Sequence, residues 1–127
     1  MTFTPGRFSD IAYGLMRFVF GALFACHGAQ KLFGAFGGQV MTHSMMLLAA
    51  GVIEFFGGIL IAVGLLTRPA ALLASGEMAV AYFWKHAPNG LWPVQNKGEP
   101  AVLYCFAFLF IAAFGTGRFG LARRPRS

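Results

Sequence analysis

The chain has 127 residues, of which 57% are hydrophobic and 11% are charged, and its formal net charge is +6. Soluble domains are usually about 45–50% apolar and about 25% charged, so a soluble fold of this length could not bury so much apolar surface. The positive charges are dispersed except at the C-terminal end, which argues against nucleic acid as a partner. Composition therefore favours a single domain that lies in the lipid bilayer.

The first apolar segment, residues 11–33, is long enough to cross a membrane. It contains Arg17 and lacks a small-residue cleavage pattern, so we expect a retained helix rather than a signal peptide. Five of its side chains recur at spacings of three and four, which places them on one stripe of that helix. They are Arg17, Phe20, Phe24, His27 and Lys31.

Three further segments follow, at residues 44–66, 69–84 and 100–114. The second has one charge, Glu54, and the last two are short for membrane spans. Pro69 and Pro100 suit the first turn of a helix, where no backbone N–H is needed. The short connection at 67–69 predicts an antiparallel hairpin, and we expect the last helix to return beside the first. The predicted fold is an all-α, integral membrane, up-down four-helix bundle.

Lysine and arginine counts in the flanking segments predict the orientation. One side receives Arg7, Arg68 and the four arginines of the tail at 118–127, and the other receives Lys31, Lys85 and Lys97. Basic residues favour the cytoplasmic side. We therefore expect both termini in the cytoplasm, at a bacterial-type inner membrane. The loop at 85–99 is either a lid or a solvated hairpin on the membrane surface.

Charged residues within the spans predict internal pairing, because an unpaired charge in the bilayer costs about 2.5–3.5 kcal/mol on insertion scales. Arg17 and Glu77 lie at matching predicted depths and form the expected pair. Glu54 then shares Arg17, finds another donor or is protonated. These three residues are an expected ion-pair network, whose alternative role is only to fix helix register.

A second polar group is expected at the outer mouth, the end of the bundle opposite the termini. His27 and Lys31 are an i, i+4 pair on one helix face. His86 and Glu99 should reach the same level, with Glu99 as the counter-ion of Lys31. We assign proton or ligand-binding roles to Glu54, His27 and Lys31. The spacing of the histidines and carboxylates does not support a metal site.

In this order and spacing, the motifs of the chain resemble the DoxX family of small four-helix membrane proteins, related to the DoxD subunit of thiosulfate:quinone oxidoreductase. The resemblance covers about residues 11–117. It rests on Arg17, His27-Gly28, Lys31, Gly51-x-x-Glu54, Gly57-Gly58, Gly64-Leu65-Leu66-Thr67-Arg68, Glu99 and Gly115-x-Gly117. It implies a membrane subunit associated with oxidoreductases, with sulfur or quinone chemistry in some members. Gly120 and Ala122 stand where the family usually has serine and aspartate.

Three functions remain open at this point. The first is a redox-associated subunit that binds a quinone or similar molecule near the outer mouth. The sequence has no haem, flavin or iron–sulfur motif, so electrons would come from a partner. The second is a non-catalytic accessory subunit of a larger membrane complex, or a homo-oligomer. The third is a small solute or proton pathway through Arg17, Glu54 and Glu77.

Overall fold

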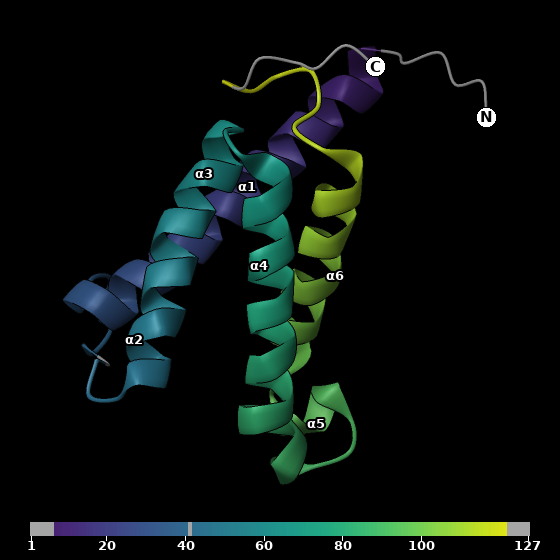
Figure 1. The fold of residues 1–127 in the computed structure, drawn as a ribbon. Helices are drawn as coiled ribbons and strands as arrows, with labels where there is room; N and C mark the ends of the chain where they lie inside the picture. The colour runs from purple at the N-terminus through teal and green to yellow at the C-terminus, as the bar shows by residue number, and fades with distance from the viewer. Residues whose placement is uncertain (1–6, 41, 122–127) are drawn as a thin grey trace.

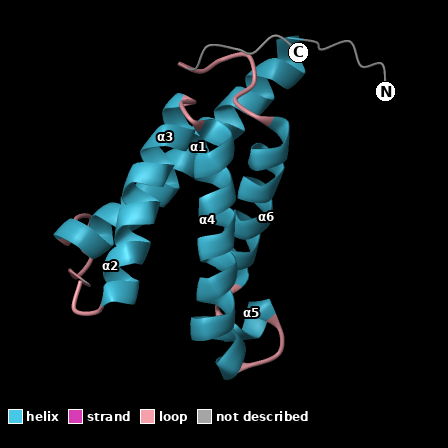
Figure 2. Ribbon diagram, in the orientation of Figure 1, coloured by secondary structure: helices cyan, strands magenta, loops and turns pink. Residues whose placement is uncertain are grey.

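The structure is a computed structural model that describes residues 7–40 and 42–121, and its regular elements are all helical in these ranges. Figure 1 traces the helices from purple to yellow, and Figure 2 shows the loops that join them. The elements are α1 (Arg7–Phe33), α2 (Met45–Val52), η1 (Ile53–Gly57), α3 (Gly58–Val63), α4 (Thr67–Ala81), η2 (Tyr82–His86), η3 (Ala87–Asn89), α5 (Pro93–Asn96) and α6 (Glu99–Phe114). The four predicted apolar segments are therefore helical, apart from residues 64–66 at the end of the second.

Helices α2 and α3 form one continuous helical segment, which a π-helical turn, η1, interrupts. The Ser44 side chain accepts a hydrogen bond from the Leu47 N–H and caps the start of this segment. Glu54 lies inside the π-helical turn. Such turns are rare and are frequent at functional sites, so Glu54 occupies an unusual backbone position.

The hairpin between α3 and α4 has the predicted length of three residues but lies earlier in the chain than predicted. It consists of Gly64, Leu65 and Leu66, with Gly64 and Leu66 in the left-handed region, at φ +76° and +51°. Thr67 already belongs to α4, so the connection predicted at 67–69 lies three residues too late. Pro69 falls in the first turn of α4, as expected.

The helices associate in two pairs. Helix α1 crosses the segment formed by α2, η1 and α3, and α4 runs along α6 (Figure 1). Aromatic contacts join the two pairs along α1 and α6, from Tyr13 and Phe110 to His27 and Tyr104, and the pairs diverge toward α2 and α5. The predicted up-down order of the long helices is observed. A closed four-helix bundle is not confirmed, because α2 stands apart from α4.

Small residues allow each pair to approach closely. A Cβ atom on Gly21 would lie 2.5 Å from the Ala62 nitrogen, and one on Gly58 would collide with Ala25. In the other pair, the fully buried Ala71 and Ala74 of α4 belong to the core cluster that contains Phe108 of α6. Close approach through small residues is typical of helix packing in lipid.

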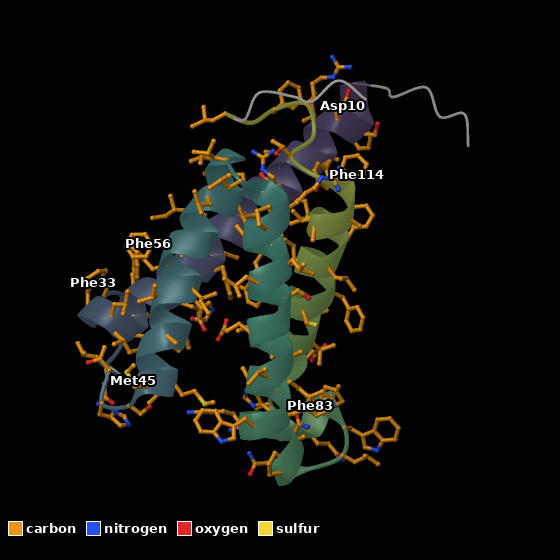
Figure 3. The ribbon with its side chains drawn as sticks, in the orientation of Figure 1. Asp10, Phe33, Met45, Phe56, Phe83 and Phe114 are labelled. Atoms are coloured by element: carbon orange, nitrogen blue, oxygen red, sulfur yellow. The ribbon has the colours of Figure 1, made fainter. Side chains whose placement is uncertain are left out.

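Two helical segments are long and apolar enough to cross a membrane, Phe8–Phe33 and Met45–Val63, and the apolar α6 is shorter. Large apolar side chains cover the outside of the described residues, and Figure 3 labels Phe33, Phe56, Phe83 and Phe114 among them. An exposed apolar surface of this extent suits a lipid environment. Three of the four tail arginines, Arg123, Arg124 and Arg126, lie outside the described residues.

Candidate functional site

A cavity of about 980 Å³ lies where the two helix pairs diverge. Its walls come from α1, the α2–η1 segment, α4, η2 and the start of α6. Most of the lining is apolar, with Phe24, Leu47, Leu73 and Trp84 among it. Lys31, Glu54 and Glu77 add polar groups to these walls. This composition is typical of small-molecule sites, which have apolar walls and few polar groups.

Lys31 and Glu54 form an ion pair at the wall of this cavity. Lys31 Nζ donates to Glu54 Oε1 across 2.6 Å. The Glu54 side chain is 2% exposed and that of Lys31 is 24% exposed, so the carboxylate is buried and the ammonium reaches the cavity edge. The expected pairing of Lys31 with Glu99 is therefore wrong. Lys31 can reach Glu54 because α1 crosses the π-helical turn η1, which places the two side chains at the same level.

Glu77 lines the same cavity from α4, as Glu54 does from η1. Its Oε1 atom is buried and has no hydrogen-bond donor as partner among the described residues. The predicted pairing of Glu77 with Arg17 is wrong. The sequence placed Glu77 about two turns from the start of its helix, whereas it lies ten residues after Thr67, near the level of Lys31.

Arg17 instead binds backbone carbonyls. Its Nε donates to Ile61 O at 2.9 Å, its Nη2 to Ala62 O at 3.2 Å and its Nη1 to Thr116 O at 2.6 Å. Ile61 and Ala62 lie at the end of α3, and carbonyls at a helix C-terminus attract cations. Arg17 is 4% exposed, so these bonds satisfy a buried charge without a carboxylate.

One more side chain links the helix pairs at this end, and another ties α4 to α6 within its own pair. The Tyr13 hydroxyl donates to Gly115 O at 2.7 Å. Arg68 donates to the carbonyls of Ala112, Ala113 and Phe114 at the end of α6. The expected ion-pair network of Arg17, Glu54 and Glu77 thus divides into a carbonyl-binding joint around Arg17 and a carboxylate cluster around Glu54.

The structure brings three of the four expected mouth residues to the cavity, His27, Lys31 and His86. The His27 ring packs edge-on against Tyr104, with centroids 5.9 Å apart. Glu99 is exposed and lines a smaller hollow of about 360 Å³ instead. It begins α6 on the other side of Tyr104, and so it stays out of the main cavity.

The loop at 85–99 is organised around the buried Asn96. Its Nδ2 donates to the Tyr82 hydroxyl and to Gly90 O, each at 3.0 Å, and its Oδ1 accepts from the Gly98 N–H at 2.8 Å. The Asn96 carbonyl also lies 3.3 Å from His86 Nδ1. The loop therefore holds His86 beside the cavity, whether or not it also rests on the membrane.

Sequence reasoning missed two features of the site. The π-helical turn leaves no mark in an apolar sequence, although the Gly57-Gly58 pair stands at its end. The place of Glu54 and Glu77 in the lining of one cavity depends on relative helix depth, which the ends of apolar segments do not fix. Cys26 and Cys105 are both free. No group of three His, Cys, Asp or Glu side chains among the described residues could hold a metal ion.

Comparison with known proteins adds a family match. The model of the DoxX family matches residues 13–87, more than half of the chain and most of the residues around the cavity. A curated protein of Haemophilus influenzae, described as uncharacterized, is 41% identical over 109 residues, which cover 80% of this chain and 81% of that protein. No solved structure matches the chain.

Proposed function

The chain belongs to the DoxX family, and from this premise we propose that it is a membrane protein that binds a quinone or a similar lipid-soluble molecule in the cavity between its helix pairs. The proposal rests on one observation. A cavity of about 980 Å³ with mostly apolar walls carries the Lys31–Glu54 pair and Glu77. Its volume lies at the upper end of the usual range for small-molecule sites, about 300–1,000 Å³.

The polar groups around the cavity suit a quinone ring. Quinone oxygens need hydrogen-bond partners, and the Lys31 ammonium has three N–H donors, of which Glu54 uses one. The His27 and His86 rings offer further nitrogen atoms. A bound quinone would supply two-electron redox chemistry, with a partner protein as the electron source. The apolar lining, with Leu72, Leu73 and Val80 of α4, would hold the hydrocarbon part.

The same proposal includes an inner-membrane location with both termini in the cytoplasm. Two observations support it. The start of α1 and the end of α6 lie at one end of the molecule, as Tyr13 and Gly115 show by their hydrogen bond. The lysine and arginine counts favour that end for the cytoplasm.

Copurification tests the binding proposal. The full chain is purified from native membranes, and its lipid extract is analysed by chromatography and mass spectrometry. The ratio of quinone to total lipid in this extract should exceed the same ratio in the membrane from which the protein was purified. Gly76→Trp should reduce the bound quinone, because Gly76 lines the cavity and has open space beside it.

Gly57→Trp is the matched control, since Gly57 also has open space beside it but does not line the cavity. It should retain the quinone. Equal quinone content in both variants and in a control membrane protein would refute the proposal. A stable larger partner without quinone would instead support the accessory-subunit function.

A further inference from the structure

The loop that follows η2 presents large apolar side chains on its outside. Leu91 and Val94 are each 77% exposed, and Trp92 is 61% exposed. They lie at the start of the short helix α5, which this loop contains. Exposed apolar side chains that gather in one place mark a contact with another protein or with a membrane. These three side chains, the apolar tip of the loop, therefore indicate a surface that something else covers.

Hydrogen bonds fix the shape of this loop, so the apolar tip cannot turn inward without breaking them. The side chain of the buried Asn96 binds Gly90 O and the Gly98 N–H within the loop. It also donates to the Tyr82 hydroxyl on η2. The backbone N–H of Asn96 donates to Trp92 O at 2.9 Å. The middle of the loop is thereby joined to both of its ends, and the tip is held on the outside.

The loop does not close the large cavity. The cavity is lined by Trp84, Lys85 and His86 of η2 but by none of residues 87–98, all of which the structure describes. The apolar tip therefore faces the surroundings of the protein rather than the candidate ligand site. Of the two roles that the sequence left open for this loop, the geometry favours the one at the membrane surface over the lid.

The neighbouring surface has the chemistry of a lipid interface. Phe83 and Trp84 of the adjoining η2 are exposed as well, and Figure 3 shows Phe83 at the same end of the molecule as the loop. Lys85 and Lys97 are exposed at the two ends of the loop, and residues 83–98 contain no acidic side chain. Tryptophan is enriched at the boundary between lipid headgroups and acyl chains, and lysine is attracted to anionic headgroups.

We propose that the apolar tip is a membrane anchor, whose partner is the lipid at the headgroup–acyl boundary of the leaflet on this side. Leu91, Trp92 and Val94 enter this boundary, and Lys85 and Lys97 bind the phosphates beside them. The inference goes beyond the proposed function, since it requires no ligand in the cavity. Because the loop is hydrogen-bonded to η2, which lines the cavity, the anchor also fixes the depth of the cavity in the bilayer.

The two tryptophans of the chain allow a direct test. Trp84→Phe leaves Trp92 as the single indole. The full-length variant is reconstituted into phospholipid vesicles whose acyl chains carry bromine near the headgroup, near the chain end or not at all. Bromine quenches indole fluorescence at short range, so Trp92 should lose most emission when the bromine lies near the headgroup. The water-soluble quencher acrylamide should reduce its emission only slightly.

Variants of the tip connect this contact to its apolar side chains. In the Trp84→Phe background, Leu91→Ser/Val94→Ser should weaken the bromine quenching of Trp92 and strengthen its quenching by acrylamide. Gln95→Ser is the matched control, since it changes an exposed polar side chain next to Val94, and it should leave both quenching effects as they were. Circular dichroism confirms that each variant is folded.

Every result decides the proposal. Strong quenching of Trp92 by acrylamide, with no effect of bromine, would show a solvated loop and overturn it. Protection from both quenchers would place the tip against protein, such as a second copy of the chain, and would also overturn it. So would bromine quenching that the serine variant leaves unchanged. Should Trp84→Phe fail to fold, the difference in emission between the unaltered chain and Trp92→Phe supplies the same readout.

Discussion

The Lys31 ammonium lies 2.6 Å from the Glu54 carboxylate, and this ion pair ties α1 to the π-helical turn. Removing one partner leaves the other as an uncompensated buried charge, which lowers the unfolding free energy by about 3–5 kcal/mol for a fully buried pair. Lys31 is partly exposed, so we expect Lys31→Met to lower the unfolding free energy by about 3 kcal/mol, at the low end of this range. Thermal and denaturant unfolding in detergent measure the change.

The double variant Lys31→Met/Glu54→Leu is the control for this prediction. It removes both charges, so it should recover most of the lost stability, in line with the near-neutral replacement of buried ion pairs by apolar residues. If the double variant loses as much stability as the two single variants summed, the pair contributes no coupling between the helices.

Arg17→Leu should destabilise the fold by about 3 kcal/mol or more, because it removes three hydrogen bonds from a buried charged group. The joint between the helix pairs loses its link from α1 to Thr116. Arg118→Leu is the control, since Arg118 forms an exposed ion pair with Asp10 that should contribute at most about 1 kcal/mol. Equal unfolding midpoints for the two variants would contradict the buried role of Arg17.

Gly58→Ala should lower the unfolding free energy by about 1–3 kcal/mol, since the new methyl group meets the backbone of Ala25 on α1. The helices of this pair would have to separate. Gly57→Ala should not destabilise the fold, because the space beside Gly57 is open. The unfolding midpoints of the two variants are measured in detergent. A lower midpoint for Gly57→Ala than for Gly58→Ala would show that α1 packs on a different face of this helix.

Asn96→Ala should loosen the loop at 87–98, because it leaves the Gly98 N–H and the Tyr82 hydroxyl without this partner. Loss of these buried bonds costs about 1–3 kcal/mol, so hydrogen exchange in the loop should accelerate by about tenfold or more. Gln95→Ala, at an exposed neighbour, should leave the exchange unchanged. Unaltered protection in Asn96→Ala would mean that other contacts fix the loop.

The orientation is tested with single cysteines in a background where Cys26 and Cys105 are replaced by alanine. Gln95→Cys should react with a membrane-impermeant thiol reagent added outside intact cells. Leu121→Cys, at the end that carries the termini, should react only after the cells are opened. The opposite labelling pattern would invert the proposed topology.

Much of the helical architecture could be predicted from the sequence, because long apolar runs and first-turn prolines are local signals. The segment ends predicted at residues 33 and 114 agree with α1 and α6. The side chains of Phe24, His27 and Lys31 share the predicted stripe, and all three line the cavity. These predictions depended only on helical periodicity and span length.

The pairing of charges could not be predicted in the same way. It depends on relative helix depth and crossing angle, which no local pattern fixes. The predicted start of the helix that carries Glu77, at residue 69, lies two residues after its observed start at Thr67, so the predicted depth of Glu77 is too close to that of Arg17. Pairing each charge with an opposite charge also leaves out the true partners of Arg17, which are backbone carbonyls. Helix ends expose such unpaired carbonyls.

The hydrogen bonds of Arg17 to Thr116 and of Tyr13 to Gly115 fix the two helix pairs to each other at one end of the molecule. A rotation of one helix pair about this end would displace the far ends most. It would change the separation of Met46 on α2 from Trp84 on η2 more than that of Ile61 from Phe108 in the core. The breadth of the cavity would therefore vary with the angle between the two helix pairs.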